Sequence, residues 1–196
     1  HASSVAAMLE MLGSAAVSNQ VSDVLKTEVA IIIGAKPTVN HPVAATFMKN
    51  AAKNGTKIVV IDPYRSELTR HAEHFFQLTP DNDVALLNSL MHVIIKEKLY
   101  DFEFIDKRTI DFEKLRRCVK SYSPKKVAPI CGVTAQEIEA VARLFANAKS
   151  AMIFWGMGIS QHIHGTDNAR CLISLALLCG QIGRSGTGIH PLRGQN

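Results

Sequence analysis

Apolar residues are grouped in this chain into short, nearly continuous runs. Three of these runs, residues 28–34, 57–61 and 151–156, lie between glycine, proline or polar positions. Runs of this length are typical of strands that are buried on both faces of a parallel sheet. The shorter run Phe75–Leu78 predicts a further strand. The pattern therefore predicts a sheet that contains these four strands.

The stretches between the predicted strands are mostly amphipathic. Their apolar residues recur every three or four positions, which is the period of a helix with one buried face. Thr134 and Glu137 have the spacing of a capping box, which marks the start of a helix. The sequence predicts helices over residues 2–12, 43–53, 83–98, 134–148 and 168–179, mixed helical segments outside the sheet over 101–120, and a connector over 124–129.

Strands and helices alternate along the chain, which predicts an α/β fold. The strand–helix–strand unit over residues 28–61 should be parallel and right-handed. We therefore expect a doubly wound, mostly parallel sheet in a Rossmann-like arrangement of three layers, with helices on both faces. Residues 1–196 are expected to form one such domain. Because the chain begins at His1 and ends abruptly at Asn196, we expect it to be one domain of a longer protein.

Composition narrows the class of protein. The chain has 196 residues, of which 47% are hydrophobic and 20% charged, so it is long enough and apolar enough to bury a core. Apolar runs are too short for a membrane span, which needs about 20 residues. The net charge of +5 is modest and is expected to be spread along the chain, which argues against nucleic acid as the partner.

Cysteine and histidine spacings give little support for a metal site. The four cysteines have no C-x-x-C spacing and suit a reducing compartment, so we expect a cytoplasmic location. His162 and His164 alternate and could face one side as a metal pair, but no third ligand stands at a fixed spacing from them. We therefore expect no metal ligand within this sequence.

Candidate binding residues follow the predicted strands. Ligands of open parallel sheets bind outside the carboxyl ends of the strands, so these ends should open on one cleft. The loops over residues 34–42, 62–65, 79–83 and 156–161 carry glycine, proline, aspartate, asparagine and basic residues, which can hold a base, a sugar and phosphates. Asp62 is suited to accept from ribose hydroxyls. Turn geometry alone would also explain such loops, since neither G-x-G-x-x-G nor a P-loop is present.

Taken together, several motifs resemble one family over essentially the whole chain: the alpha subunits of molybdenum- or tungsten-dependent formate dehydrogenases, within the bis-molybdopterin guanine dinucleotide oxidoreductases. The most specific motifs are W-G-M-G-x-x-Q and, further along, P-x-R-G-Q-N. The matching stretches are His1–Ala6, Gly34–Pro37, Asn40–Pro42, Asp62-Pro63, Ala85–Asn88, Trp155–Gln161 and Pro191–Asn196.

The resemblance implies oxidation of formate to CO2 at a bis-molybdopterin guanine dinucleotide with molybdenum or tungsten. In that family the cysteine or selenocysteine that ligates the metal directly precedes the residue matching His1, and the [4Fe-4S] cysteines lie further toward the N-terminus. The chain would be the domain that holds the guanosine end of one pterin. Its partners would be the remaining domains and an iron–sulfur or NAD-reducing electron-transfer subunit. Alone, it is expected to carry no cofactor and to be inactive.

The resemblance also implies roles for individual residues. Arg193 would hold formate as a bidentate pair, and His1 would take a proton or orient the substrate. The chain departs from the family pattern at Lys36, Tyr64 and Asp81, where Asn, Arg and Gly are usual. The predicted cofactor-binding residues are Gly34, Lys36, Asn40, His41, Asp62, Arg65, Pro80, Asp81, Asp83, Gly156, Met157, Gly158, Gln161 and Gln195.

Two alternatives remain open at this point. One is a sister enzyme of the same family, such as a nitrate reductase, although the pairing of His1 with Arg193 favours formate. The other is a non-catalytic scaffold that kept the fold and lost the cofactor. The three departures in the nucleotide loops favour the scaffold more than any other feature of the sequence does.

Overall fold

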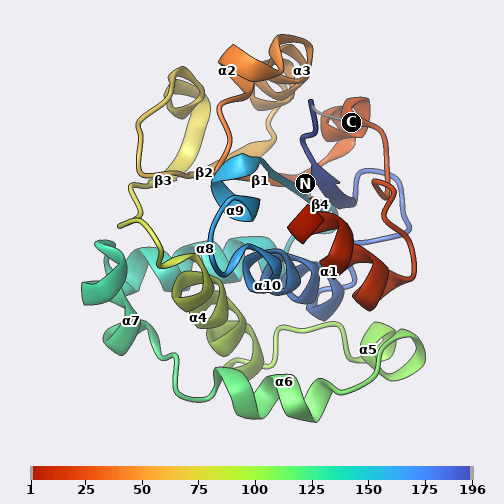
Figure 1. Cartoon of the computed structure of the whole chain (residues 1–196), viewed down its shortest axis with the longest axis vertical. Coiled ribbons are helices and arrows are strands. Elements are labelled where there is room, and N and C mark those ends of the chain that lie inside the picture. The colour runs from red at the N-terminus through yellow and green to blue at the C-terminus, as the bar shows by residue number, and fades with distance from the viewer. Residues whose placement is uncertain (1, 195–196) are drawn as a thin grey trace.

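Five strands, all parallel, form one sheet at the centre of the molecule (Figure 1). The computed structural model describes residues 2–194. The strand order is β3-β2-β1-β4-β5, so β1 lies in the middle, and Ile31 pairs with Val59 of β2 on one side and with Ile153 of β4 on the other. The strands are β1 (Val29–Ile33), β2 (Lys57–Ile61), β3 (Ala72–Phe76), β4 (Ala151–Trp155) and β5 (Gly188–Pro191).

Alternate side chains of the strands enter two separate cores. Ile31 and Ile33 point into the larger core, which α4 (Asp83–Lys96), α8 (Ala135–Ala146) and α10 (Gly165–Leu178) cover. Ala30 and Ile32 point into the smaller core. The predicted three-layer, doubly wound α/β fold is therefore confirmed. The smaller core is covered by α3 (Pro42–Lys53) and the 3-10 helices η1 (Val21–Lys26) and η2 (Glu67–His71).

The remaining helices are short or peripheral. Helix α1 (Ala2–Leu12) packs on α10, and its Ser4 hydroxyl accepts from the Trp155 indole N–H at 2.9 Å. Single helical turns, α2 (Pro37–Asn40) and α9 (Met157–Ser160), follow β1 and β4 directly. In Figure 1, α5 (Phe102–Arg108) and α6 (Phe112–Val119) lie at the bottom of the molecule, beyond the layer of α4 and α10. The predicted helical segments outside the sheet are thus confirmed.

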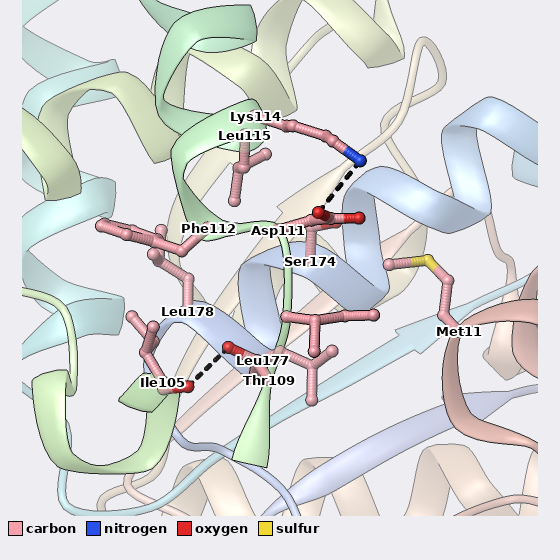
Figure 2. Close-up of a pocket in the computed structure, with 11 residues that line it drawn as sticks. Met11, Ile105, Thr109, Asp111, Phe112, Lys114, Leu115, Ser174, Leu177 and Leu178 are labelled. Carbon is pink, nitrogen blue, oxygen red and sulfur yellow. Dashed lines mark hydrogen bonds and ion pairs between the residues drawn. The ribbon is translucent and has the colours of Figure 1, made fainter. Parts of the chain in front are cut away.

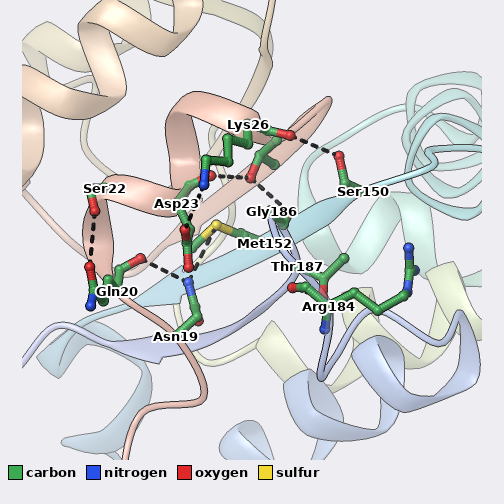
Figure 3. Close-up of polar contacts among 11 residues, drawn as sticks. Asn19, Gln20, Ser22, Asp23, Lys26, Ser150, Met152, Arg184, Gly186 and Thr187 are labelled. Carbon is green, nitrogen blue, oxygen red and sulfur yellow. Dashed lines mark hydrogen bonds and ion pairs between the residues drawn. The ribbon is translucent and has the colours of Figure 1, made fainter.

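Hydrogen bonds tie together the segments that enter β1, β4 and β5 (Figure 3). The Ser150 hydroxyl donates to the Lys26 carbonyl at 3.2 Å, and the Thr27 hydroxyl donates to the Gly186 carbonyl at 2.8 Å. Gly186 has a φ of +74°, and a Cβ there would lie 2.6 Å from the Lys26 carbonyl oxygen, so only glycine fits. These contacts cover the amino-terminal ends of the strands. The carboxyl ends, where ligands of such sheets bind, lie on the opposite side.

The structure corrects several predicted elements. The strand predicted at Phe75–Leu78 is Ala72–Phe76, because β3 is a half-exposed edge strand whose sequence has no continuous apolar run. The predicted connector over residues 124–129 is part of α7 (Pro124–Cys131). Pro124 occupies its first turn, where no N–H is needed, and burial of Val127 and Cys131 offsets the bond lost at Pro129. The 3-10 helices, the single turns α2 and α9, and β5 were not predicted.

Other element boundaries shift by one to three residues from those predicted, as is usual at frayed helix ends. The capping box at Thr134 is confirmed: its hydroxyl accepts from the Glu137 N–H, and the Glu137 carboxylate accepts from the Thr134 N–H. No helix within residues 2–194 is long and apolar enough to cross a membrane.

Candidate functional site

Two glycine loops meet where the chain leaves β1 and β4. The Gly158 N–H donates to the Gly34 carbonyl at 3.0 Å. A Cβ on Gly34 would lie 2.8 Å from the Gly158 carbonyl carbon, and one on Gly156 would lie 2.7 Å from the Gly34 carbonyl oxygen. Because α3 and α10 then depart to opposite faces of the sheet, this is the switch point at which open α/β sheets bind ligands.

Lys36, Asp62 and Tyr64 form one cluster from the loops after β1 and β2. The Lys36 ammonium lies 3.8 Å from the centroid of the Tyr64 ring. The Tyr64 backbone N–H donates to Asp62 Oδ1 at 2.8 Å. The Tyr64 side chain itself is 59% exposed, so its ring is open to a planar ligand. Two of the three departures from the family pattern therefore contact each other.

Asp62 is the buried carboxylate of this cluster. Burial raises the pKa of Asp62, while the Tyr64 N–H and the positive charge of Lys36 act in the opposite direction. Desolvation disfavours the charged form of this carboxylate, and the hydrogen bond from the Tyr64 N–H compensates for only part of that cost. Asp62 is therefore suited to accept hydrogen bonds from ligand hydroxyls or N–H groups.

The guanidinium of Arg65 lies over the Phe75 ring, 4.5 Å from its centroid. Its exposed side chain is thus directed toward β3. The next residue, Ser66, has a buried hydroxyl that lacks a hydrogen-bond partner among the described residues. Burying a hydroxyl without a partner destabilises the fold, and a hydrogen bond to a bound ligand would remove that penalty.

The loop after β3 contacts the loop after β4 through Asp81. The His162 Nδ1–H donates to Asp81 Oδ1 at 2.6 Å. Asp81 has a φ of +65°, a conformation that favours glycine, so the third departure carries backbone strain as well as a charge. Buried Asp83 opens α4, and desolvation raises its pKa; the charge of His162 lowers that pKa, whereas Asp81 and Asp62 raise it further.

A pocket of about 860 Å³ opens beside this pair of loops. Asp81, Gln161 and His162 line its polar rim, and α4, α6 and α10 supply its other walls. His162, which the sequence presents with His164 as a candidate metal pair, bonds instead to Asp81, and no group of three metal-binding side chains occurs in residues 2–194.

Three of the four cysteines are buried or partly buried: Cys131 and Cys179 are buried, and Cys171 is intermediate. Burial raises the pKa of Cys131 to about 11 and the pKa values of Cys171 and Cys179 to about 12. These thiols stay protonated at neutral pH, and a protonated thiol is a poor metal ligand.

Arg193 follows β5 and reaches the same edge. Its Nη2–H donates to the Ala15 carbonyl at 2.8 Å, and its own carbonyl accepts from His41 Nε2 at 3.3 Å. The Nε–H of Arg193 is buried and has no partner among the described residues. A buried guanidinium N–H without an acceptor is energetically costly, so this N–H is a candidate donor to a bound ligand.

The remaining predicted residues lie on the same edge with exposed or half-exposed side chains: Asn40 after β1, Pro80 after β3, and Met157 and Gln161 after β4. His1 and Gln195 lie outside the described residues. Sequence reasoning named Tyr64 as a departure and His162 as a metal candidate but included neither in the binding site. Their partners come from other strand ends, so no local spacing could have shown these contacts.

Comparison with known proteins relates the chain to one family. A family model described as molybdopterin oxidoreductase matches residues 2–194. Formate dehydrogenase H of Escherichia coli is 42% identical over 196 residues, which are 100% of this chain and 27% of that protein. The F420-dependent formate dehydrogenase subunit alpha of Methanocaldococcus jannaschii is 40% identical over 196 residues, 100% of this chain and 29% of that protein.

Among solved structures, acetylene hydratase from Pelobacter acetylenicus is similar, with a TM-score of 0.81 at 28% identity. The match covers 95% of this chain and 25% of that one. The chain therefore spans less than a third of the length of each of these three proteins.

Proposed function

The chain belongs to the molybdopterin oxidoreductase family, and from that premise we propose that it holds the guanosine end of a molybdopterin guanine dinucleotide in a formate-oxidising subunit. The convergence of Lys36, Asp62 and Tyr64 at the switch point is the observation that carries this proposal. We propose further that residues 1–196 act as one domain within the longer protein.

The residues at the switch point fit the nucleoside part of such a cofactor. The free oxygen of Asp62 would accept from the ribose hydroxyls, and the exposed ring of Tyr64 would stack on the base. Lys36 supplies the positive charge beside them for a phosphate. The unpartnered Ser66 hydroxyl, next to this loop, is a further polar group that a ligand would satisfy.

Asp81 and Asp83 extend the carboxylate surface toward the loop after β4. Carboxylates repel phosphate but accept from N–H donors, and the edge of a guanine base presents such donors. Asp62 and Asp83 together favour a ligand whose base and sugar face this side and whose phosphates face Lys36. Asp81 already accepts from His162, and its added charge and side chain hinder the close approach of a nucleotide. The arrangement thus matches a nucleoside diphosphate better than an isolated phosphate.

Arg193 would contact the substrate. Its buried, unpartnered Nε–H is a donor that the carboxylate of formate would satisfy by a charge-assisted hydrogen bond. The bond from Nη2 to the Ala15 carbonyl fixes the plane of the guanidinium. When bound, the pterin-held metal supplies the two-electron chemistry; this chain positions the nucleotide end and the anion.

Other parts of the longer protein would complete the centre. We propose that they hold the second pterin, the metal's thiolate or selenolate ligand and a [4Fe-4S] cluster. The name of the Methanocaldococcus relative describes a subunit alpha, which supports assembly with an electron-accepting subunit.

Titration of this chain with GDP by calorimetry tests the nucleotide assignment. We expect weak binding, in the upper micromolar range or about −5 kcal/mol, because one domain encloses only part of the ligand. Asp62→Asn should weaken binding roughly tenfold or more, since hydrogen bonds to charged groups contribute about 1.5–3 kcal/mol. Asp106→Asn on exposed α5 is the matched control. No detectable GDP binding, or equal binding by both variants, would instead favour a scaffold that lost the cofactor.

A further inference from the structure

Trp155, the last residue of β4, joins α1 to the segment that carries Arg193. Its indole N–H donates to the Ser4 hydroxyl of α1 at 2.9 Å, and its backbone carbonyl accepts from the Leu192 N–H at 2.7 Å. Trp155 and Ser4 are each only 1% exposed, so water does not compete for the bond between them. One residue therefore holds both a helix on the face of the sheet and the chain just before Arg193.

The guanidinium of Arg193 in turn contacts α1. Its Nη2 lies 3.7 Å from the Sδ of buried Met8, and it donates to the carbonyl of Ala15, which lies shortly after α1. The contacts form a closed ring, in which α1 bonds to Trp155, Trp155 bonds to Leu192, and Arg193 contacts α1. A displacement of α1 relative to β4 would therefore move the groups that orient the guanidinium.

Apolar packing alone leaves room beside the last turn of α1. Met11, in that turn, borders a hollow of about 240 Å³ that Ile105 of α5 and Leu178 of α10 also line (Figure 2). Figure 2 shows Met11 on one side of the hollow, with Ile105 and Leu178 across from it. A helix turn that borders open space is held by fewer neighbouring atoms. Directional contacts at the start of α1 therefore contribute more to its position.

Two serines at the start of α1 make such directional contacts. The Ser3 hydroxyl donates to the Ser160 carbonyl at 3.1 Å, but this bond is only partly buried. The bond between Ser4 and Trp155 is fully buried. Removing the Ser4 hydroxyl would leave a buried indole N–H without an acceptor, which costs more than losing a bond that water can replace. The buried bond therefore has the larger influence on where α1 lies.

We propose that Ser4 and Trp155 are positioning residues for the substrate: their hydrogen bond fixes α1 against β4, and α1 in turn holds the Arg193 guanidinium in the orientation that receives formate. This inference rests on the proposed function, in which Arg193 contacts formate. Neither Ser4 nor Trp155 touches the substrate, and each acts through Arg193. Because a hydrogen bond weakens steeply as its angle departs from linearity, a small rotation of the guanidinium is enough to weaken the binding of the anion.

Steady-state kinetics of the complete, metal-loaded subunit test the proposal. Trp155→Phe keeps an aromatic ring but removes the N–H, and Ser4→Ala removes its acceptor. Each variant should raise KM for formate about three- to tenfold, the effect of weakening one hydrogen bond, while kcat per bound metal stays within about twofold. The double variant should raise KM no further than the single variants, because both changes remove the same bond.

Ser89→Ala in α4 is the matched control. Ser89 is also fully buried, but its hydroxyl has no hydrogen-bond partner among the described residues, so KM should not change. Poor folding or poor loading of the cofactor reduces the amount of active enzyme, which lowers kcat and leaves KM unchanged. That pattern in Ser4→Ala and Trp155→Phe would show that their bond serves stability alone and would overturn the proposal.

Hydrogen exchange in this chain gives a measurement that needs neither formate nor a cofactor. The Nε–H of Arg193 is buried, and its NMR signal is identified by its loss in Arg193→Lys. In Ser4→Ala and Trp155→Phe this N–H should exchange with water at least about tenfold faster, whereas the amide of Ile31 in the central strand should keep its rate. Equal acceleration at both positions would indicate a general loss of stability, and an unchanged rate at Arg193 would show that α1 does not hold it; either result would overturn the proposal.

The two measurements separate this inference from the proposed function. A complete subunit that does not oxidise formate would refute the proposed function, and with it the substrate role of Ser4 and Trp155, whatever the exchange rates show. A subunit that oxidises formate with the same KM in both variants would leave the proposed function intact and refute only the positioning role.

Discussion

The glycine contact between the loops after β1 and β4 leads to a quantitative prediction about stability. Gly34 has a φ of +56°, and a Cβ there would lie 2.8 Å from the backbone of Gly158. Gly158→Ala would meet Gly34 Cα at the same 2.8 Å, but Gly158 does not have a left-handed φ. Gly13 supplies the complementary case, with a φ of +72° and nothing within 4 Å of its Cβ position. The three alanine variants thus separate backbone strain from collision.

The expected costs follow from these differences. Gly13→Ala should lower the free energy of unfolding by about 1–2 kcal/mol, the cost of a left-handed alanine. Gly158→Ala should cost about 1–3 kcal/mol, because the neighbour is backbone and must shift. Gly34→Ala has both problems and should cost about 2–5 kcal/mol, close to the sum of the other two. Folded proteins typically have a free energy of unfolding of about 5–15 kcal/mol, so the Gly34→Ala variant should lose a large part of its stability.

Urea unfolding at 25 °C, followed by circular dichroism, gives the three values. The reasoning fails if Gly34→Ala is no more destabilising than Gly13→Ala, because the two loops would then have room to separate. A change in the slope of the unfolding free energy with urea would instead indicate an altered unfolded state, and the comparison would be repeated by thermal unfolding.

The remaining predictions concern Arg193, Asp81 and His190. Arg193→Lys in the complete subunit should lower kcat/KM for formate, with a loss of transition-state stabilisation on the order of 2–4 kcal/mol, because an ammonium cannot replace the guanidinium N–H groups. An unchanged kcat/KM would remove Arg193 from the site. Asp81→Gly should tighten GDP binding in calorimetry by removing a carboxylate from the loop, and weaker binding would show that Asp81 accepts from the base. Burial lowers the pKa of His190 from 6.5 in the folded state. As the pH falls, the unfolded state therefore binds more protons than the folded state, and the free energy of unfolding should drop between pH 7.5 and 5.5. Urea unfolding of His190→Gln should show a smaller drop.

The central strands could be predicted almost to the residue because both of their faces are buried. Lys57–Ile61 and Ala151–Trp155 have the predicted bounds, apart from one glycine after β4, because every residue of these strands except exposed Lys57 is apolar and buried. Edge strands have no such constraint. Ala72–Phe76 contains Glu73 and His74, and β5 ends at Pro191, so neither strand carries the pattern of a buried strand.

The candidate site divides in the same way. Its position at the strand ends follows from the fold class, which the alternation of strands and helices predicts. The contacts within it do not, because Lys36 meets Tyr64 and Asp81 meets His162 across separate loops. The 3.8 Å contact of Lys36 with Tyr64 depends on how two crossovers place their first residues, which is a property of the whole sheet.

The departures from the family pattern therefore act as contacting pairs. Lys36 lies over Tyr64, and both affect the same buried carboxylate of Asp62. A cation over an exposed ring contributes only about 0.5–1 kcal/mol, a small part of the stability of a folded domain. The same energy at the ligand-binding edge changes a dissociation constant by about two- to fivefold. Substitutions at these positions should consequently adjust the affinity for the nucleotide while leaving the fold intact, and neither member of a pair can be assigned a role without its partner.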